Sequence, residues 1–486
     1  MRKKLRQLLA LLLALTMVMS LAACQPAEKP TEASKKTDAP EPDDKTEAPA
    51  DETEAPKEYE LGSWALVDDP ASKTGTVRFW SNLTLKQGMQ GILDAFNEAY
   101  PNITVEFTSY SNNADGNAQA NAAIMGGEID VLMSSTLQHA YNRWNNNLYL
   151  PLTDYIEEYG IDVKKEWGTD SYNLDGVYYT FPVGGNIYYI VINKTAWDEA
   201  GLGEIPTEWT WDEYLAASEA MTKRDEKGKT IVYGGSDFHS IEFAAYPWMQ
   251  VTGKHFLYTE DGQAANFTDP IVLNMLKREI KAEQEDGIWF PLLTYRDEDV
   301  DDYALFLNGD IASFISNNFV KYLRDTETYP RDFKAAFAPY PVEEKGQTNY
   351  MSGVATNYHV GITNGVQDED AAWTFLSWFS TYGSQYMLLS GNAPKWLGAD
   401  ISDSELLCMV FDSEERAAEL IDIDSWKSTM YLMDAPIFEE HSLLAYTDVL
   451  NLLKEYVMLA HRGEMTPEDA MQTAKELADA KIKEAQ

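Results

Sequence analysis

The stretch from residue 76 to residue 133 alternates between strand-like and helix-like patterns, and this limits the fold more than any other feature. Thr76–Trp80 and Ile103–Phe107 are short β-rich runs, and Ile129–Met133 has the composition of a third, buried strand. Two stretches with helical character separate these runs, the second over Gln119–Met125. The order strand, helix, strand, helix, strand predicts an α/β fold with right-handed crossovers.

Length and charge exclude several classes of protein. A chain of 486 residues is too long for one compact domain, and 44% hydrophobic and 12% aromatic residues are enough to bury a core. Its 38 Lys and Arg against 79 Asp and Glu give a net charge of −41, which argues against nucleic-acid binding and against attraction to an anionic bilayer. Two cysteines cannot form a disulfide framework or a Cys-rich zinc site.

The first residues have the layout of a signal peptide, which we assign to residues 1–23. A basic start precedes the apolar run Leu8–Met19, which is too short for an ordinary membrane-spanning helix. The sequence Leu21-Ala22-Ala23-Cys24 then resembles the lipobox of bacterial lipoproteins. That resemblance implies cleavage before Cys24 and a lipid on its thiol; a plain secreted protein is the alternative.

Residues 24–60 are rich in Pro, Glu, Ala, Thr, Lys and Asp and almost free of apolar side chains. Thr46–Pro49 recurs as Thr53–Pro56. Such a segment cannot bury enough surface to offset the entropy of ordering, so we expect a disordered tether between the lipid and the folded body.

Polar and aromatic residues follow each of the three predicted strands. They are Trp80-Ser81-Asn82, Thr108-Ser109-Tyr110 and Ser134-Ser135-Thr136. Ligands of open α/β sheets bind beyond the carboxyl ends of the strands. Hydroxyls, amides and aromatic faces suit a neutral polyhydroxylated ligand, although strands also end in turn residues for purely structural reasons.

The chain resembles the family 1 extracellular solute-binding proteins of bacterial ABC importers, which include maltodextrin-binding protein. The matching elements occur in family order, and they are Val77–Trp80, Phe96–Ile103, Gly127–Val131, Leu148–Thr153, Asp175–Pro182, Ile192–Lys194, Ala200–Leu202, Pro206–Tyr214, Phe306–Ala312, Ala338–Pro341, Ala371–Leu376 and Gly391–Pro394. The sequence departs from the family at Ile192, where Tyr is usual, and at Asn317-Asn318-Phe319, where sugar-binding members often have Gly, Pro and Trp.

The resemblance implies a two-lobed α/β fold of the type II periplasmic-binding-protein kind, with a ligand cleft between the lobes. We expect a first lobe of residues 61–183 plus 355–400 and a second lobe of residues 184–354 plus 401–486. The first chain crossing falls near Phe181–Gly185, where Gly184 and Gly185 could act as a hinge. A second crossing is expected near Gly353–Thr356.

The candidate ligand contacts combine the strand ends with positions taken from the resemblance. They are Trp80, Ser81, Asn82, Tyr110, Ser134, Ser135, Asn186, Trp248, Asn317, Asn318, Gly353 and Trp396. The rings of Trp80 and Trp396 are expected to face the opposite lobe. Core packing is the rival explanation for the tryptophans, and a capped turn for Asn186.

Signals of catalysis or metal binding are weak. The sequence has no Gly-Lys-Ser/Thr phosphate loop and no Gly-x-Ser-x-Gly elbow, and none of its six histidines is paired at metal spacing. The acidic run Asp297–Asp302 predicts an exposed loop and lacks the EF-hand pattern, which leaves calcium a minor possibility. Cys408, in the apolar run Leu406–Val410, is expected to be buried.

Together these features predict a monomeric, lipid-anchored binding protein outside the cell, with no catalytic residue, cofactor or metal ion. Its partners would be a carbohydrate ligand and the permease subunits of an ABC importer, with no nucleic acid and with membrane contact only through the lipid. Two alternatives stay open: a cell-surface carbohydrate-active enzyme, and a binding protein for a non-sugar solute such as a peptide or polyamine.

Overall fold

The computed structural model describes residues 59–170, 172–237, 240–298, 300–317, 319–352, 355–399, 403–430 and 443–486. All of them belong to one compact unit, Tyr59–Gln486. The predicted signal peptide, Cys24, most of the predicted tether, Asn318 and Gly353 lie outside the described residues. Tyr59 belongs to the ordered body and not to the tether, because its hydroxyl donates to Oε1 of Glu166 at 2.6 Å.

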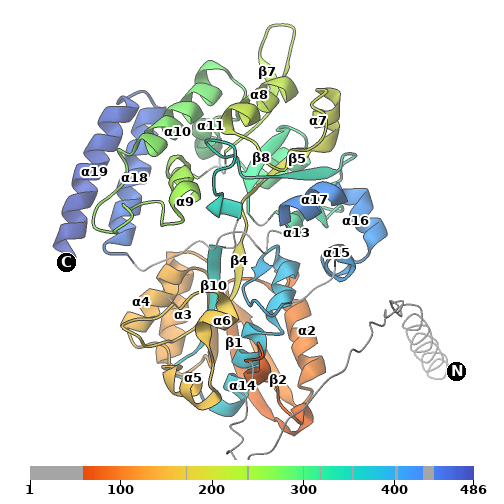
Figure 1. Ribbon diagram of the computed structural model, residues 1–486, viewed down its shortest axis with the longest axis vertical. Coiled ribbons are helices and arrows are strands. Elements are labelled where there is room, and N and C mark those ends of the chain that lie inside the picture. The colour runs from red at the N-terminus through yellow and green to blue at the C-terminus, as the bar shows by residue number, and fades with distance from the viewer. Residues whose placement is uncertain are drawn as a thin grey trace, which may run out of the picture. The chain divides into compact units, whose positions relative to one another are not determined.

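The first lobe is built around a mixed sheet with the strand order β11-β4-β10-β3-β1-β2 (Figure 1). Its strands are β1 (Gly75–Ser81), β2 (Ile103–Ser109), β3 (Val131–Ser134), β4 (Phe181–Asn186), β10 (Ala355–Ile362) and β11 (Ala393–Pro394). β1 pairs in parallel with β2 and β3, which confirms the predicted α/β core. β10, β4 and β11 pair antiparallel beyond it.

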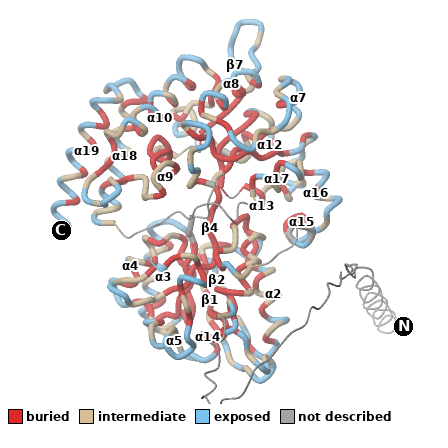
Figure 2. Tube along the Cα trace, viewed as in Figure 1, coloured by how far each residue is buried: buried red, intermediate tan, exposed pale blue. Residues whose placement is uncertain are grey.

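Helices cover both faces of this sheet. They are α2 (Met89–Ala99), α3 (Ala114–Met125), α4 (Leu137–Asn145), α5 (Thr153–Tyr159), α6 (Val163–Trp167) and α14 (Glu369–Ser380), with short 3-10 turns η1 (Ser63–Ala65), η2 (Pro70–Ser72), η3 (Leu85–Gln87) and η7 (Ser384–Ser390). Because side chains alternate along a strand, Phe79 packs with α2 and α14, whereas Leu132 packs with α3 and α4. The buried sheet stands out between exposed helix surfaces in Figure 2.

The second lobe surrounds an antiparallel sheet with the order β8-β5-β9. These strands are β8 (Ser313–Ser316), β5 (Tyr189–Asn193) and β9 (Ala335–Pro339), and a separate hairpin joins β6 (Lys223–Arg224) to β7 (Thr230–Val232). Ile190 and Ile192 pack on one face, whereas Tyr189 and Val191 pack on the other. Ile192, a departure from the family pattern, is therefore a core residue.

The helices of the second lobe come from two stretches of the chain. The first supplies α7 (Lys194–Glu199), α8 (Trp211–Met221), η4 (Phe243–Ala245), α9 (Tyr246–Thr252), α10 (Pro270–Ile280), the π-helical η5 (Lys281–Glu285), α11 (Leu292–Glu298), α12 (Asp302–Leu307), α13 (Val320–Leu323) and η6 (Tyr350–Ser352). The second supplies α15 (Asp403–Phe411), α16 (Glu414–Leu420), α17 (Ile423–Met430), α18 (Tyr446–His461) and α19 (Pro467–Glu484). Helices α18 and α19 share a hydrophobic core with α10.

The first crossing between the lobes differs from the prediction. Gly184 and Gly185 lie inside the buried strand β4, and Gly184 pairs with Tyr358 of β10. A Cβ on Gly184 would lie 3.0 Å from the side chain of Met387, so close packing against η7 accounts for this glycine better than a hinge. The sheet of the first lobe thus runs past residue 183 to Asn186, and Ile187-Tyr188 lead into the second sheet.

Two local expectations are also corrected. Cys408 is exposed, because the helical spacing of α15 turns Leu407 and Val410 inward and leaves the thiol on the outer face. The acidic run that begins at Asp297 is not a loop throughout, since Asp297 and Glu298 end helix α11. Asp301 caps α12 by accepting bonds from the amides of Tyr303 and Ala304.

Candidate functional site

The carboxyl ends of β1, β2 and β3 meet at one edge of the first sheet, as the parallel pairing requires. The amide of Tyr110, just after β2, donates to the carbonyl of Ser81 at 3.0 Å. Its hydroxyl reaches the carbonyl of Met133 in β3, at 2.9 Å. The structure therefore brings together five of the predicted residues: Ser81, Asn82, Tyr110, Ser134 and Ser135.

The hydroxyls at this edge are already occupied by the protein. Ser134 Oγ accepts a bond from Nη1 of Arg143 at 2.7 Å and lies 2.8 Å from the hydroxyl of Tyr149. Ser135 Oγ donates to Oδ1 of Asn112 at 2.7 Å, and Ser81 Oγ accepts from the amide of Leu83 at 2.9 Å. These serines fix the loops behind the strands, so part of their hydrogen-bonding capacity is used within the protein.

Two histidines near this edge are neutral. His139 lies 3.0 Å from Ser135 Oγ, and burial together with the nearby Arg143 lowers its pKa to about 4. Burial, with a smaller contribution from Lys395, lowers the pKa of His359 to about 3. A neutral imidazole can donate or accept a hydrogen bond but brings no charge to the site.

Buried amides behave differently from the serines. Over the described residues, Oδ1 of Asn82, Asn186, Asn317 and Asn392 has no hydrogen-bond partner, and neither has Oγ of Ser316. All five residues are buried or half-buried. Because an unpaired buried acceptor costs roughly 1–3 kcal/mol, these oxygens need a partner from outside the chain, which is either water or a ligand.

The sheet registers place these residues around the segment that joins the two lobes. β11 pairs Ala393 with Gly185, so the next pair in this register is Asn392 with Asn186. Asn186 is followed by the crossing, and Tyr189 at its far end pairs with Ser316 of β8. The acceptors therefore lie on both sides of the crossing.

Tyr358 of β10 links the amides of the first lobe. Its hydroxyl is within hydrogen-bonding reach of the side chains of Asn392 and Asn82, which partly offset the effect of burial. The net result raises the pKa of Tyr358 to about 12, so this hydroxyl stays protonated. We call the set of Asn82, Asn186, Ser316, Asn317, Tyr358 and Asn392 the junction group.

The predicted tryptophans lie in three different surroundings. Trp80 is half-buried against the α3–α4 core. Trp248, 8% exposed, packs with α18 and α19, and its Nε1 has no partner within the described structure. Trp396, 4% exposed, donates to Oε2 of Glu166 and packs against Tyr382 with ring centroids 4.9 Å apart.

These contacts of Trp396 all lie in the first lobe, and Gly62 and Gly398 also press against its ring. We therefore assign Trp396 to the core in place of the expected ligand contact. The resemblance placed this residue next to the chain's return to the second lobe, and sequence position alone could not show which way the indole points.

Sequence reasoning missed three members of the junction group: Ser316, Tyr358 and Asn392. Asn392 stands within Gly391–Pro394, a segment already matched to the family, and its amide was the available signal. Tyr358 had no such signal, because β10 reaches this edge only through antiparallel pairing with β3 and β4.

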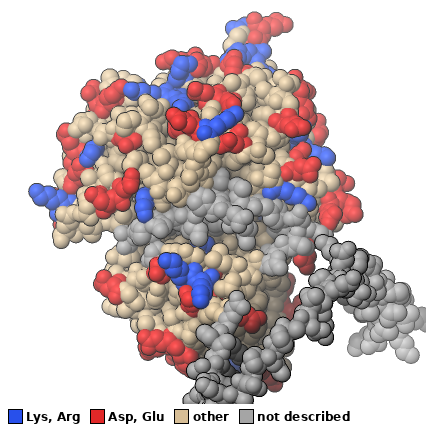
Figure 3. Space-filling view, in the orientation of Figure 1, with Lys and Arg blue, Asp and Glu red and all other residues tan. Residues whose placement is uncertain are grey.

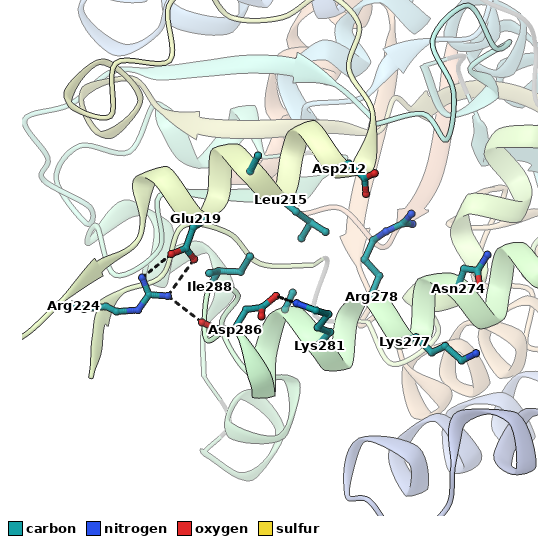
Figure 4. A pocket seen from close by; sticks show the side chains of 12 residues that line it. Asp212, Leu215, Glu219, Arg224, Asn274, Lys277, Arg278, Lys281, Asp286 and Ile288 are labelled. Atoms are coloured by element: carbon teal, nitrogen blue, oxygen red, sulfur yellow. Dashed lines mark hydrogen bonds and ion pairs between the residues drawn. The ribbon is translucent and has the colours of Figure 1, made fainter. Parts of the chain in front are cut away.

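A cavity of about 720 Å³ lies elsewhere, between α8 and α10 of the second lobe (Figure 4). None of the junction group lines it. Arg224 binds Glu219 and the carbonyl of Asp286, whose carboxylate pairs with Lys281. Two further cations are paired outside the cavity, Lys277 with Glu468 and Arg278 with Glu343. Because these charges satisfy one another, the cavity is a weaker candidate than the junction group.

Acidic side chains are spread over the face shown in Figure 3, with Lys and Arg between them. Within the described part of the chain, no three His, Cys, Asp or Glu residues are grouped as ligands of a metal ion.

A sequence profile of the bacterial extracellular solute-binding proteins matches residues 80–386. The chain belongs to this family. The match begins in β1 and ends in η7, so it spans both sheets and includes most of the junction group. Membership confirms the resemblance found in the sequence, and members of the family are binding proteins that act outside the cytoplasm.

Solved sugar-binding proteins share the fold of this solute-binding protein. A substrate-binding protein of Listeria monocytogenes in complex with cycloalternan has a TM-score of 0.64 at 16% identity, covering 84% of this chain and 99% of its own. The maltose/maltodextrin-binding domain from Bdellovibrio bacteriovorus bound to maltotriose has a TM-score of 0.59 at 17% identity, covering 84% and 100%.

A third similar structure is the cyclic α-maltosyl-1,6-maltose binding protein of Arthrobacter globiformis, with a TM-score of 0.60 at 19% identity, covering 85% and 100%. At these identities the likeness establishes the fold, which is the two-lobed fold of periplasmic sugar-binding proteins. No helix in the described ranges of this solute-binding protein is long and apolar enough to cross a membrane.

Proposed function

We propose that this protein is the lipid-anchored substrate-binding component of a carbohydrate ABC importer. It captures a sugar or oligosaccharide outside the cell and delivers it to the permease subunits in the membrane. It acts as a monomer and carries out no reaction.

The observation that supports this proposal most strongly is the junction group. Four amide oxygens and one hydroxyl oxygen lack partners there, counted over the described residues. A saccharide offers many hydroxyl donors, so it can satisfy several such acceptors at once. Half-buried Trp80, close by at the end of β1, supplies an aromatic surface of the kind on which the C–H face of a sugar packs.

The position of the junction group also suggests how ligand binding changes the conformation that the permease meets. Tyr358 lies in β10 of the first sheet, with Asn82 just after β1 and Asn392 just before β11, whereas Ser316 ends β8 of the second sheet and Asn317 follows it. A ligand that bonds to both sets stabilises the arrangement in which the lobes approach, and this differential affinity shifts the population toward the closed form.

A thermal-shift screen tests the ligand class. The purified body, residues 59–486, is heated with neutral oligosaccharides, acidic oligosaccharides, small peptides and polyamines. A ligand that binds only the native state raises the melting temperature. We expect a rise with one of the saccharides; a rise with peptides or polyamines alone would contradict the proposal.

Recovery of the bound saccharide separates binding from catalysis. After overnight incubation of protein with the identified ligand, chromatography should return the ligand unchanged in amount and length. Shortened or oxidised products would instead support a carbohydrate-active enzyme.

The anchor is tested with Cys24→Ser in cells. We expect the variant to appear in the medium or to remain unprocessed, because serine has no thiol to carry the lipid. A matched Cys408→Ser variant should stay on the membrane, since Cys408 is exposed in the folded body. Membrane retention of Cys24→Ser, with residue 24 unmodified in the wild type, would contradict the lipoprotein assignment.

A further inference from the structure

Lys321 follows the second-lobe part of the junction group closely in the chain. It lies in the short helix α13, which follows Ser316 and Asn317 at the end of β8. Its Nζ lies over the ring of Tyr322, 5.3 Å from the centroid, and that ring stacks on Tyr303 at 4.1 Å. The aromatic stack holds the ammonium group in place and excludes water from one side of it.

No carboxylate in the described structure pairs with Lys321. The charge that acts on it is the guanidinium of Arg324, another cation. Burial, together with this repulsion, lowers the pKa of Lys321 to about 8. This arrangement is unexpected in a chain with 79 acidic and 38 basic residues, where a carboxylate partner would be easy to supply.

Helix α13 also touches the first lobe beside the junction group. Nη2 of Arg324 donates to the carbonyl of Leu389 in η7 at 2.7 Å. The hydroxyls of Tyr322 and Tyr358 are close enough to interact electrostatically. Tyr358 in turn reaches Asn82 and Asn392, so the tyrosine under the Lys321 ammonium group is coupled electrostatically to the hydroxyl that links the first-lobe amides.

The first lobe also contains a buried cation that no carboxylate pairs with in the described structure. Arg143, 1% exposed, donates to Asn121 at 2.9 Å, Asn117 at 2.8 Å and Ser134 at 2.7 Å, all of them neutral. No ion pair joins Arg143 to a carboxylate within the described ranges. Its charge lowers the pKa of His139, which shows that its field reaches the strand ends.

A buried charge without a counter-ion is costly, and a ligand anion can remove that cost. Lys321 is a half-buried cation of this kind next to α13's contact with the first lobe, and Arg143 is a buried one at the strand ends of the first lobe. We propose that the ligand is an acidic saccharide, and that Lys321 binds a carboxylate of a uronate residue while the junction amides bind its hydroxyls. This inference rests on the proposed function, because it names the class of saccharide for the same site.

The surface charge of the protein does not oppose this assignment at working salt. At 0.1 M ionic strength the Debye length is about 10 Å, so the exposed acidic residues are largely screened from an approaching anion. Contacts within the partly buried junction are screened much less.

The test is isothermal titration of the wild-type body with trigalacturonate and with the neutral trisaccharide maltotriose. We expect trigalacturonate to bind at least about tenfold more tightly, the usual scale of a hydrogen bond to a charged group. Lys321→Met keeps the apolar stem and removes the charge, so it should weaken trigalacturonate by about tenfold and change maltotriose by less than about twofold.

Two further variants separate the role of charge from packing. Lys321→Arg keeps the charge and should retain most of the affinity for trigalacturonate. Lys334→Met removes an exposed lysine of the same lobe and should leave both affinities unchanged. Melting curves of every variant establish that it is folded.

Equal or tighter binding of maltotriose would overturn the inference and leave the proposed function intact. Equal weakening of both saccharides by Lys321→Met would also overturn it, because the lysine would then act through structure. Failure of the wild type to bind any saccharide in the thermal-shift screen would contradict the proposed function itself.

Discussion

Two polar clusters, one inside the first lobe and one on both sides of the crossing between the lobes, differ in one respect. In the first, the carboxylate of Glu166 accepts bonds from Tyr59, Gly62, Trp64 and Trp396 at 2.5–3.2 Å. In the second, the junction group, four amide oxygens from segments around the crossing have no partner in the described structure. A buried polar group therefore points to a ligand only where its hydrogen bonds are incomplete. Burial by itself does not point to one.

The Glu166 cluster explains how the body begins. Its donors come from the first described residues and from the segment after β11, and Glu166 itself lies in α6, so one carboxylate joins three distant parts of the chain. Because all of its bonds are internal, we expect it to contribute to stability and not to binding.

The largest effect is expected for Glu166→Leu. The substitution leaves the donors of Tyr59, Gly62, Trp64 and Trp396 without an acceptor, so the free energy of unfolding should fall by about 3–5 kcal/mol. Urea denaturation measures this loss. Glu157→Leu, at an exposed position of α5, is the control and should change stability by less than about 0.5 kcal/mol. A small loss for Glu166→Leu would remove the distinction between the two clusters.

A third cluster in the second lobe is intermediate, because its charged groups lie within ion-pair distance while neither ring nitrogen of His461 makes a hydrogen bond in the described structure. His461 of α18 lies 3.6 Å from Glu279 and 3.4 Å from Glu283. The two carboxylates raise the pKa of His461 to about 10, and burial raises the pKa of Glu279 to about 7. Both groups therefore hold protons more tightly in the folded protein than in the unfolded chain.

This cluster should make the protein less stable as pH rises. The contribution of Glu279 is complete below its ordinary pKa of 4.5 and is lost as pH passes about 7, and that of His461 is complete below 6.5 and is lost toward about 10. Melting temperatures between pH 5 and pH 10 measure the trend. In Glu279→Gln the melting temperature should fall less between pH 5 and about pH 7 than in the wild type. Stability that increases across this range in the wild type, and is unchanged in the variant, would contradict the assignment.

Asn186→Ala tests the junction group directly. The side chain has no hydrogen bond to lose at Oδ1, so unfolding should change by less than about 1 kcal/mol. Saccharide affinity should fall by about tenfold, because the ligand loses an acceptor. Titration calorimetry compares this variant with Asn145→Ala, at an exposed position that ends α4. Full affinity in Asn186→Ala would show that the unpaired oxygen belongs to the protein's own architecture.

The smallest effect is expected for Trp80→Ala. Trp80 is half-buried beside the strand ends, so its loss should weaken saccharide binding several-fold while the protein stays folded. Trp396→Ala is the matched opposite: it should destabilise the fold by about 3 kcal/mol or more and leave affinity unchanged where the protein is folded. The comparison fails if both variants lose affinity equally at matched stability.

Much of the first lobe was predictable because its signals are local. The runs over Thr76–Trp80 and Ile103–Phe107 became β1 and β2, and the helix expected over Gln119–Met125 is the second half of α3. The strand ends were expected to meet, and the bonds of Tyr110 to Ser81 and Met133 confirm it. Parallel pairing places the carboxyl ends of these strands at one edge of the sheet. Local patterns were therefore enough to predict which residues meet there.

The functions of single side chains were less predictable. The serines at positions 81, 134 and 135 were expected to face a ligand, yet Leu83, Arg143 and Asn112 already occupy their hydroxyls. Gly184 and Gly185 were expected in a hinge, yet both lie in strand β4, and Gly184 packs against Met387. Apart from Leu83, which is two residues from Ser81, the deciding neighbour is distant in sequence or on another element.

The sequence by itself determined the α/β class, the family, and the strong excess of acidic residues. Each depends on composition, on short periodic patterns or on the order of motifs, none of which requires three-dimensional contacts. Only the tertiary structure decided which polar groups are satisfied. Asn82, Asn186, Asn317 and Asn392 come from four separate elements, and whether a buried amide is paired depends on atoms that only folding brings within 3.5 Å of it. For the same reason Glu166 is a structural anchor of the fold, while the junction amides are the candidate binding site.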